Sequence, residues 1–154
     1  MAWVERVSAE VTYPLRQRVL RPHQPVRTVG FPGEAGARAG TYAARDDAGE
    51  VVGTATVYPE PCPWRPADPG AWRLRGMATD PELRGRGVGT AVLDAALAHV
   101  AAEGGTLVWC TARTPARAFY ERAGFAAHGE VFEEPEIGPH VRMWRAVSSG
   151  SGSP

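Results

Sequence analysis

A glycine-rich turn flanked by arginines is the strongest chemical signal in the chain. It runs Arg84-Gly85-Arg86-Gly87-Val88-Gly89-Thr90, between a predicted strand and the start of an amphipathic helix. Glycines let the backbone approach a ligand, and amides at a helix N-terminus converge where the helix dipole favours negative charge. The arginines add bidentate donors. A pyrophosphate or another polyanion is the natural ligand, and a tight turn with two solvated arginines is the alternative.

The spacing and the composition exclude several other kinds of site. Glycines spaced G-x-G-x-G, with no strand and acidic residue about 20 positions later, do not make a dinucleotide fingerprint. The chain has no lysine, which excludes a P-loop, a Schiff-base enzyme and a lysine general base. Ser8 is the only serine before residue 148, which argues against a serine hydrolase. The four histidines and two cysteines show no metal-ligand spacing, so no metal is expected.

A second segment places a tyrosine on a short helix. It runs Thr114-Pro-Ala-Arg-Ala-Phe-Tyr120-Glu-Arg-Ala-Gly-Phe125. Thr114 as N-cap and Pro115 as first helical residue predict the start, and Gly124 predicts a left-handed C-terminal cap. Tyr120 shares a helix face with Ala116, Phe119 and Ala123, so core packing is one interpretation. Its hydroxyl can still reach a cleft while the ring is buried, and a pKa near 10 keeps it protonated.

The elements that position these residues follow from hydrophobic periodicity and turn signals. Apolar residues at helical spacing follow the glycine turn, and β-branched runs bounded by Gly and Pro mark strands. The predicted helices are 13–20, about 88–102 and 114–123, and the predicted strands are 41–46, 50–58, 71–79, 106–111, 125–133 and 140–147. This order predicts an α/β domain over residues 1–147, followed by a flexible Ser/Gly tail at 148–154.

Composition indicates an ordinary globular protein. The 154 residues carry no formal net charge and are 44% hydrophobic, so no global attraction to nucleic acid or to a membrane is expected. No apolar run approaches the roughly 18 residues of a transmembrane helix, and no hydrophobic signal core opens the chain, so the cytoplasm is the expected location. Lysine, asparagine and isoleucine have AT-rich codons, and their near absence indicates a bacterial gene of high GC content.

Together the two segments resemble the GNAT superfamily of N-acetyltransferases. Its [R/Q]-x-x-G-x-[G/A] motif is matched by Arg84, Gly87 and Gly89, and its late F-Y-x-x-x-G-F signature by Phe119, Tyr120, Gly124 and Phe125. The resemblance covers roughly residues 40–147. The segment 130–143, and more loosely 15–22, is similar to the ElaA-like branch of small bacterial acetyltransferases.

The resemblance implies a mixed, mostly antiparallel sheet that splays between strand 72–79 and strand 106–111, with acetyl-CoA in the cleft. Backbone groups of Met77, Ala78 and Thr79 would pair with the pantetheine arm, and the amides of residues 84–90 would hold the pyrophosphate. Phe119 would lie beside the cofactor. Many members carry Asn where this chain has Arg113, so that amide contact is absent. Arg113 could instead reach a phosphate, or point outward.

Acetylation of an amine also needs proton transfer and a stabilised oxyanion. The resemblance makes Tyr120 the general acid, and the amide of Ala78 or Thr79 the oxyanion donor. His140 is the first candidate base because its unperturbed pKa is about 6.5, although it could equally anchor a loop. Other candidates for the base, besides a relay through water, are Glu133, Glu134 and Glu82.

Three further groups of residues have both a chemical and a structural interpretation. Cys110 could accept an acyl group, but a buried free thiol is the commoner case, and the same holds for Cys62. Trp64 is expected on a substrate-facing loop. The arginines of the first helix could select an acidic substrate, although a solvated face is the expected environment for Arg16, Arg18 and Arg21.

The sequence therefore predicts an acetyl-CoA-dependent N-acetyltransferase acting on a primary amine, of a small molecule in the first interpretation, by direct transfer in a ternary complex. An acceptor on a peptide or protein is one alternative. A module that binds or senses acyl-CoA without turnover is another, and an interaction subunit that uses the fold only as a scaffold is a third. The sequence leaves open whether the chain forms a homodimer.

Overall fold

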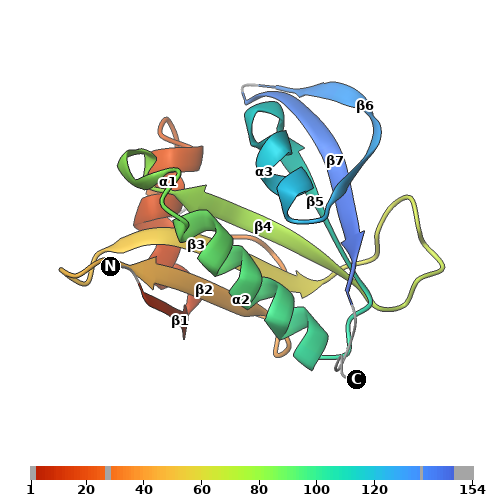
Figure 1. Cartoon of the computed structure of the whole chain (residues 1–154), viewed down its shortest axis with the longest axis horizontal. Helices are drawn as coiled ribbons and strands as arrows, with labels where there is room; N and C mark the ends of the chain where they lie inside the picture. Colours follow the sequence, from red (N-terminus) through yellow and green to blue (C-terminus); the bar gives the residue numbers. More distant parts are fainter. Residues whose placement is uncertain (1–2, 27–28, 136, 148–154) are drawn as a thin grey trace.

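A seven-stranded mixed sheet forms the centre of the computed structural model, which describes residues 3–26, 29–135 and 137–147. The strand order is β1-β2-β3-β4-β5-β7-β6. The strands are β1 (Trp3–Val7), β2 (Gly40–Arg45), β3 (Val51–Pro59), β4 (Ala71–Thr79), β5 (Leu107–Arg113), β6 (Ala126–Glu134) and β7 (Gly138–Ala146) (Figure 1). The α/β class is confirmed, and the predicted tail at 148–154 lies outside the described residues.

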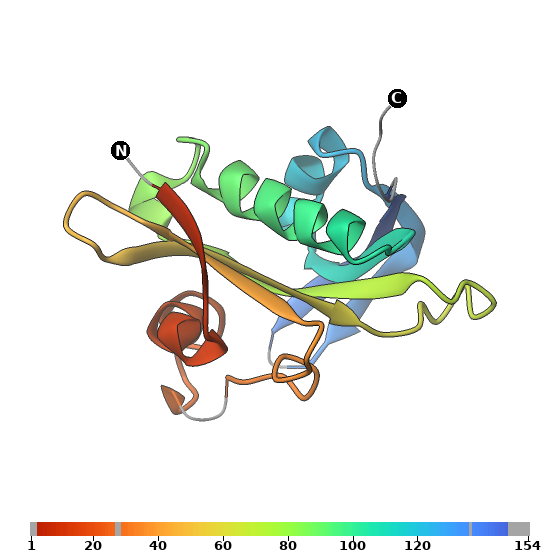
Figure 2. The ribbon, with the colours of Figure 1, turned by 90° about the horizontal axis from the view of Figure 1, so that it is seen from below.

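Helices cover both faces of the sheet. Helix α1 (Tyr13–Leu20) lies on one face, whereas α2 (Val88–Ala102) and α3 (Arg117–Arg122) lie on the other (Figure 2). The short 3-10 turns are η1 (Ala9–Thr12), η3 (Pro81–Leu83) and η4 (Thr114–Ala116). The ranges predicted for α1, α2 and β4 are confirmed, and those of the other predicted strands hold to within two residues.

The sequence analysis missed one strand and misplaced the start of one helix. The first strand was missed: β1 pairs antiparallel with β2, from Trp3 opposite Arg45 to Val7 opposite Thr41. The predicted Thr114 cap fails because β5 continues to Arg113, which pairs with His140 and takes the cap position of η4. Thr114 is therefore the first residue of a 3-10 turn, and the α-helical part begins only at Arg117.

Strands β4 and β5 separate soon after they begin. They pair in parallel over only three positions, Ala71–Leu107, Trp72–Val108 and Arg73–Trp109. Where β4 continues, its register with β3 shifts by one residue between Thr54 and Thr56. Gly76 lies in this bulge with a φ of +69°, a conformation that glycine adopts without strain. The expected splay of the sheet is therefore confirmed.

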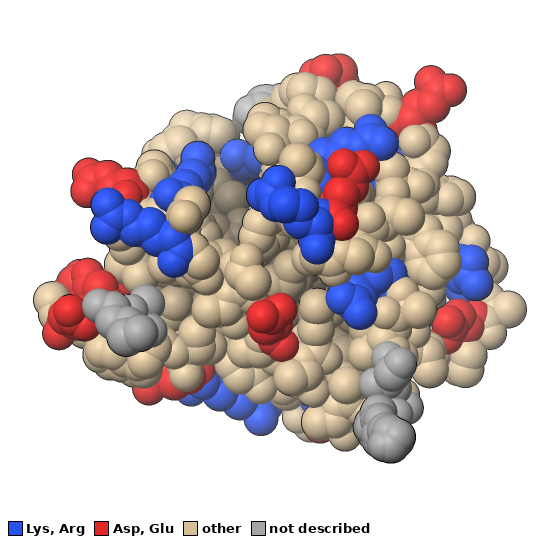
Figure 3. Space-filling model, in the orientation of Figure 1, with Lys and Arg blue, Asp and Glu red and all other residues tan. Residues whose placement is uncertain are grey.

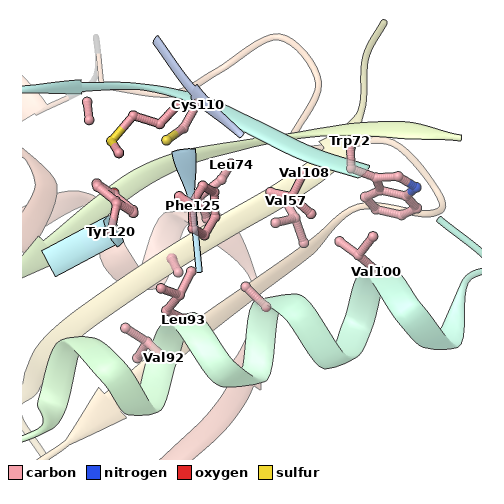
Figure 4. Close-up of a cluster of buried hydrophobic side chains, with 14 of the residues drawn as sticks. Val57, Trp72, Leu74, Val92, Leu93, Val100, Val108, Cys110, Tyr120 and Phe125 are labelled. Atoms are coloured by element: carbon pink, nitrogen blue, oxygen red, sulfur yellow. The ribbon is translucent and has the colours of Figure 1, made fainter. Parts of the chain in front are cut away.

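One core cluster joins α2 and α3 to the sheet. The side chains labelled in Figure 4 come from β3, β4, β5, α2, α3 and the loop after α3, and they include Trp72, Leu93 and Phe125. Burial on α2 follows the predicted face with one difference. Leu97 is only partly buried, whereas His99 is buried. Its Nε2 donates to the Arg38 carbonyl at 2.8 Å, so Nδ1 of the neutral ring accepts from the Tyr42 hydroxyl at 2.9 Å. This packing holds α2 and α3 against one face of the sheet.

The bulge at Gly76 provides a test of the splayed geometry. An alanine Cβ there would lie 3.0 Å from both Arg16 Nε and the Phe31 ring, at a positive φ. We expect Gly76→Ala to lower the free energy of unfolding by about 2–4 kcal/mol, since left-handed strain of about 1–2 kcal/mol adds to the clash. Urea unfolding followed by circular dichroism measures the loss.

Gly49 is the matched control for this substitution. Its φ is +85°, but no atom lies within 4 Å of the position that an added Cβ would take. Gly49→Ala should therefore cost only the strain of about 1–2 kcal/mol. Equal losses for the two variants would contradict the proposed contact of Gly76 with α1 and the Phe31 loop.

Candidate active site

A cleft of about 940 Å³ occupies the gap between β4 and β5. Its lining comes from both faces of the sheet: Leu20 and Phe31 belong to the α1 side, whereas Gly89 and Tyr120 belong to α2 and α3. Figure 3 shows basic side chains around a hollow between the loop that precedes α2 and the region of α3. The splayed strands thus open a passage from one face of the sheet to the other.

The glycine-rich turn forms one end of this cleft. Gly85 and Gly87 have φ values of +82° and +85°, so the turn depends on glycine at both positions. Helix α2 starts directly after Gly87, and no described side chain caps its first turn. The N–H groups that begin a helix have no partner within it. Their free donors and the helix dipole therefore make this end suited to an anion.

Most of the predicted cofactor-binding residues meet in this cleft. The lining includes Met77, Ala78, Thr79, Arg84, Gly85, Gly87, Gly89, Thr90, Arg113 and Phe119. Two predicted residues lie elsewhere: the Arg86 side chain is exposed outside the lining, and Val88 is buried in the core. Val88 is absent from the lining because its side chain packs in the core, so it can contribute only its backbone amide to the turn.

The backbone edges of the splayed strands are the second binding feature. Among the described residues, β4 pairs with β5 only as far as Arg73, although it runs on to Thr79. The edge of β5 that faces β4 is likewise free of a strand partner from Cys110 to Arg113. Backbone N–H and C=O groups require hydrogen-bond partners. An extended, amide-containing ligand between the strands would supply them.

Tyr120 and Cys110 form the apolar wall of the cleft. The Tyr120 ring packs edge-on against Phe119 and Phe125, with centroids 5.2 and 5.3 Å away. Burial, and next the neighbouring Cys110, raise the pKa of Tyr120 well above its ordinary value. Burial raises the pKa of the Cys110 thiol to about 12. Tyr120 is thus both a core residue and a protonated group at the cleft, whereas the neutral Cys110 thiol is a poor nucleophile.

His140 lies on the α1 side of the same cleft. It is buried on β7 directly opposite Arg113 of β5. Its Nδ1 lies 2.9 Å from the Gly138 carbonyl oxygen. Since a carbonyl only accepts, Nδ1 carries the proton, and Nε2 of the neutral ring keeps a lone pair. Of the carboxylates considered as bases, Glu134 also lines the cleft, whereas Glu82 and Glu133 are not in its lining.

Arginines from separate parts of the chain gather at the α1 end. Arg113 Nη2 donates to the Leu20 carbonyl at 2.6 Å, and Arg21 Nη1 donates to the same oxygen at 2.9 Å. Arg75 lies over the Phe31 ring, 4.2 Å from its centroid. Sequence reasoning missed Arg75 because the bulge and the Phe31 loop decide where its side chain lies. Arg113 therefore does not point outward: it lines the cleft, and its guanidinium is bound to the carbonyl at the C-terminal end of α1.

Two predicted environments were wrong. Arg16 is 1% exposed and pairs with Glu34 at 2.6 Å, so it is not on a solvated face, because α1 packs this position against the sheet. Arg18 is exposed as expected and pairs with Asp80 at 3.4 Å.

Trp64 is not in the lining of the cleft. It stacks on His128 at 4.6 Å and packs against Trp109, because its loop folds onto the far end of the sheet.

Metal-site and membrane-span features are also absent from the residues that the structure describes. No three His, Cys, Asp or Glu side chains in those ranges come together as a group that could hold a metal ion. None of their helices has the length and apolar character to cross a membrane.

Comparison with known proteins identifies the relatives of this chain. Residues 9–125 match the model of the acetyltransferase (GNAT) family. A Bacillus subtilis (strain 168) protein described as an uncharacterized N-acetyltransferase, YitI, is 32% identical over 147 residues, which are 96% of this chain and 97% of the relative.

Solved structures share the fold. Escherichia coli ElaA has a TM-score of 0.74 at 19% identity, over 94% of this chain and 99% of its own. An aminoglycoside 6'-N-acetyltransferase complexed with coenzyme A has a TM-score of 0.67 at 16% identity, over 94% and 96%. ElaA is thus one structural neighbour among many proteins of this fold.

The protonation state of Cys110 predicts its reactivity. With a folded-state pKa of about 12, the thiol stays neutral at about pH 8.5, where an unfolded cysteine is half ionised. Iodoacetamide should therefore leave Cys110 unmodified in the folded protein and alkylate it in concentrated urea, as located by peptide mass spectrometry. Ionisation above about pH 8.5 favours the unfolded chain, because only there does the thiol lose its proton. The contribution of Cys110 to the free energy of unfolding is therefore fully present at neutral pH and is lost as the pH rises above about 8.5. Rapid alkylation of Cys110 in the native protein would contradict this assignment.

Proposed function

The chain belongs to the acetyltransferase (GNAT) family, and from that premise we propose that it transfers the acetyl group of acetyl-CoA directly to a primary amine of a small molecule. The activity class is that of an N-acetyltransferase. The observation that carries the proposal for this chain is the cleft between β4 and β5, with unpaired strand edges in its middle and an uncapped helix N-terminus at one end.

The residues present fit acetyl-CoA, the acetyl donor of the family. The edges of β4 and β5 suit the amides of a pantetheine arm, with Met77, Ala78 and Thr79 as the predicted partners. The turn at residues 84–90 suits the pyrophosphate, since no side chain caps the first turn of α2 and Arg84 lines the cleft. When bound, this co-substrate supplies an activated thioester. The protein must then orient the amine, remove its proton and stabilise the oxyanion.

Tyr120 is the proposed general acid for the departing thiolate. Its hydroxyl keeps its proton because burial and the neighbouring Cys110 raise its pKa, and general acids of this kind contribute about 10²–10⁴-fold to the rate. The oxyanion donor is proposed to be a backbone amide at Ala78 or Thr79, on the unpaired edge of β4.

His140 is the proposed general base, because its Nε2 keeps a free lone pair while Nδ1 donates to Gly138. The imidazole lies on the α1 side of the sheet, beside Arg113. The acid and the base therefore approach the reacting atoms from opposite faces. This arrangement supports direct transfer in a ternary complex, in which the amine enters from the side opposite α2 and α3.

Binding of acetyl-CoA is the first test of the proposal. An added Cβ at Gly89 would lie 3.3 Å from both Phe119 and the Thr79 hydroxyl, so a valine there must push one wall into the cleft. We expect acetyl-CoA to bind the natural chain in calorimetry and to bind Gly89→Val about tenfold more weakly, equivalent to about 1.4 kcal/mol. Ala98→Val, at an exposed site of the same helix, should leave the affinity unchanged. Absence of binding to the natural chain would overturn the proposal.

Removal of the Tyr120 hydroxyl tests the assignment of the acid. In a thiol-release assay with a panel of primary amines, Tyr120→Phe should lower kcat by about 10²-fold or more while KM for acetyl-CoA changes little. Tyr42→Phe removes a hydroxyl outside the cleft lining, where its partner is His99, and should keep kcat within about twofold. An unchanged kcat for Tyr120→Phe would remove Tyr120 from catalysis. Binding of acetyl-CoA without thiol release for any amine would favour a sensing module.

A further inference from the structure

The charges that line the cleft are strongly unbalanced. Seven arginines contribute to the lining, whereas Glu134 is the only carboxylate among the described lining residues. The whole chain carries no net charge, so this excess is local. Arginines also surround the hollow in Figure 3. An excess of this kind in a cleft attracts anions and repels cations.

Two nearby arginines, Arg16 of α1 and Arg73 of β4, already have carboxylate partners. Arg16 pairs with Glu34 at 2.6 Å, and Arg73 pairs with Glu60 at 3.1 Å. Among the ion pairs within the described residues, none involves Arg21, Arg75 or Arg113. Arg21 and Arg113 share one neutral carbonyl, that of Leu20. This carbonyl satisfies one donor of each guanidinium but cancels no charge.

The unpaired guanidinium groups are close enough to oppose one another. Burial, and next Arg75, lower the pKa of Arg21, and Glu134 opposes this effect. Burial, and next Arg21 and Arg84, lower the pKa of Arg113. The four guanidinium groups therefore form a row of neighbouring positive charges, in the order Arg75, Arg21, Arg113 and Arg84. Half-buried like charges cost free energy unless an anion compensates them.

The two ends of this series belong to different parts of the cleft. Arg84 precedes the glycine turn on the side of α2. Arg21 and Arg75 instead separate the cleft from a recess of about 180 Å³, which they line together with Leu20 and Phe31. This recess lies beside α1, on the face of the sheet that carries His140 and Arg113. An amine that approached His140 would thus have its far end near Arg21 and Arg75.

We propose that the amine acceptor carries a carboxylate, which Arg21 and Arg75 bind beside the recess while the amine faces His140. This inference rests on the proposed acetyl transfer and adds the chemical class of the acceptor. The planar guanidinium group matches a carboxylate with two parallel N–H donors. Phe31, which lies under Arg75 at 4.2 Å, holds that guanidinium in place and adds an apolar wall for the linker between the amine and the carboxylate.

Binding to the CoA-saturated protein tests the proposal without relying on turnover. Two matched pairs differ only in the carboxylate: 4-aminobutyrate with n-butylamine, and 4-(aminomethyl)benzoate with benzylamine. In calorimetry we expect the carboxylate of at least one pair to bind about tenfold or more tightly than its neutral partner, as for a hydrogen-bonded charge. Equal affinities in both pairs, or no binding of any of the four compounds, would overturn the proposal.

Substitution of Arg75 shows whether this guanidinium causes the preference. Arg75→Gln should abolish the tenfold preference while the affinity for CoA changes less than about twofold. Arg117→Gln removes an exposed arginine of α3 whose partner is Glu121 and should keep the preference. Thermal melts confirm that both variants are folded. A preference that survives Arg75→Gln, or a loss confined to CoA affinity, would assign the arginines to the cofactor and overturn the proposal.

Acetyl-CoA titration and thiol release distinguish this inference from the proposed function. A protein that prefers carboxylated amines but releases no thiol from acetyl-CoA would contradict only the proposed function. A protein that acetylates neutral and carboxylated amines with equal kcat/KM, and binds them equally, would contradict only the carboxylate proposal.

Discussion

The early separation of β4 from β5 is the constraint on which the site depends. A sheet normally satisfies the backbone groups of its inner strands with neighbouring strands, but here three residue pairs are followed by two open edges. The bulge at Gly76 turns β4 away, and β7 keeps β5 in place by pairing along its whole length. The open edges and the turn before α2 give the cleft its binding groups, and the passage they leave lets groups from both faces of the sheet reach the same atoms.

A buried ion pair fixes the other wall of this passage. Arg16 of α1 donates to Glu34, to the Val29 carbonyl at 3.2 Å and to the Thr56 hydroxyl at 2.7 Å, and it lies over the Phe31 ring. These contacts tie the helix, the loop around residues 29–34 and β3 together. Separation of the pair would leave two buried charges without partners, which costs free energy. Arg16 and Glu34 therefore stay together. This ion pair holds α1 against the sheet, and with it the Leu20 carbonyl that accepts from Arg21 and Arg113.

The sequence predicted what depends on local pattern and missed what depends on distant contacts. The glycine turn, α2 and β3 were predicted because their glycines, helical periodicity and β-branched residues are encoded in neighbouring positions. Trp3–Val7 has weak alternation of burial and becomes a strand only through its pairing with β2. The contact of Arg113 with Leu20 spans 93 positions of the chain, and the stacking of Trp64 on His128 likewise joins distant segments. Periodicity indicates that a residue is polar, but only the packing of α1 shows that Arg16 is buried and that Arg21 faces the cleft.

The two faces of the cleft suit the two proton transfers that acetylation requires. On the side of α3, burial keeps the hydroxyl of Tyr120 and the thiol of Cys110 protonated, so this face can donate a proton but offers no competing nucleophile. On the side of α1, Arg113 lies directly opposite His140, and Arg21 shares the Leu20 carbonyl with Arg113. An ammonium group placed there is disfavoured relative to the neutral amine, since like charges lower its pKa. A carboxylate bound by Arg21 and Arg75 would offset part of the positive charge at the far end of the acceptor, whereas Arg113 stays beside His140. Arg21 and Arg75 would thus select the acceptor, whereas Arg113 would favour the deprotonated amine that attacks the thioester.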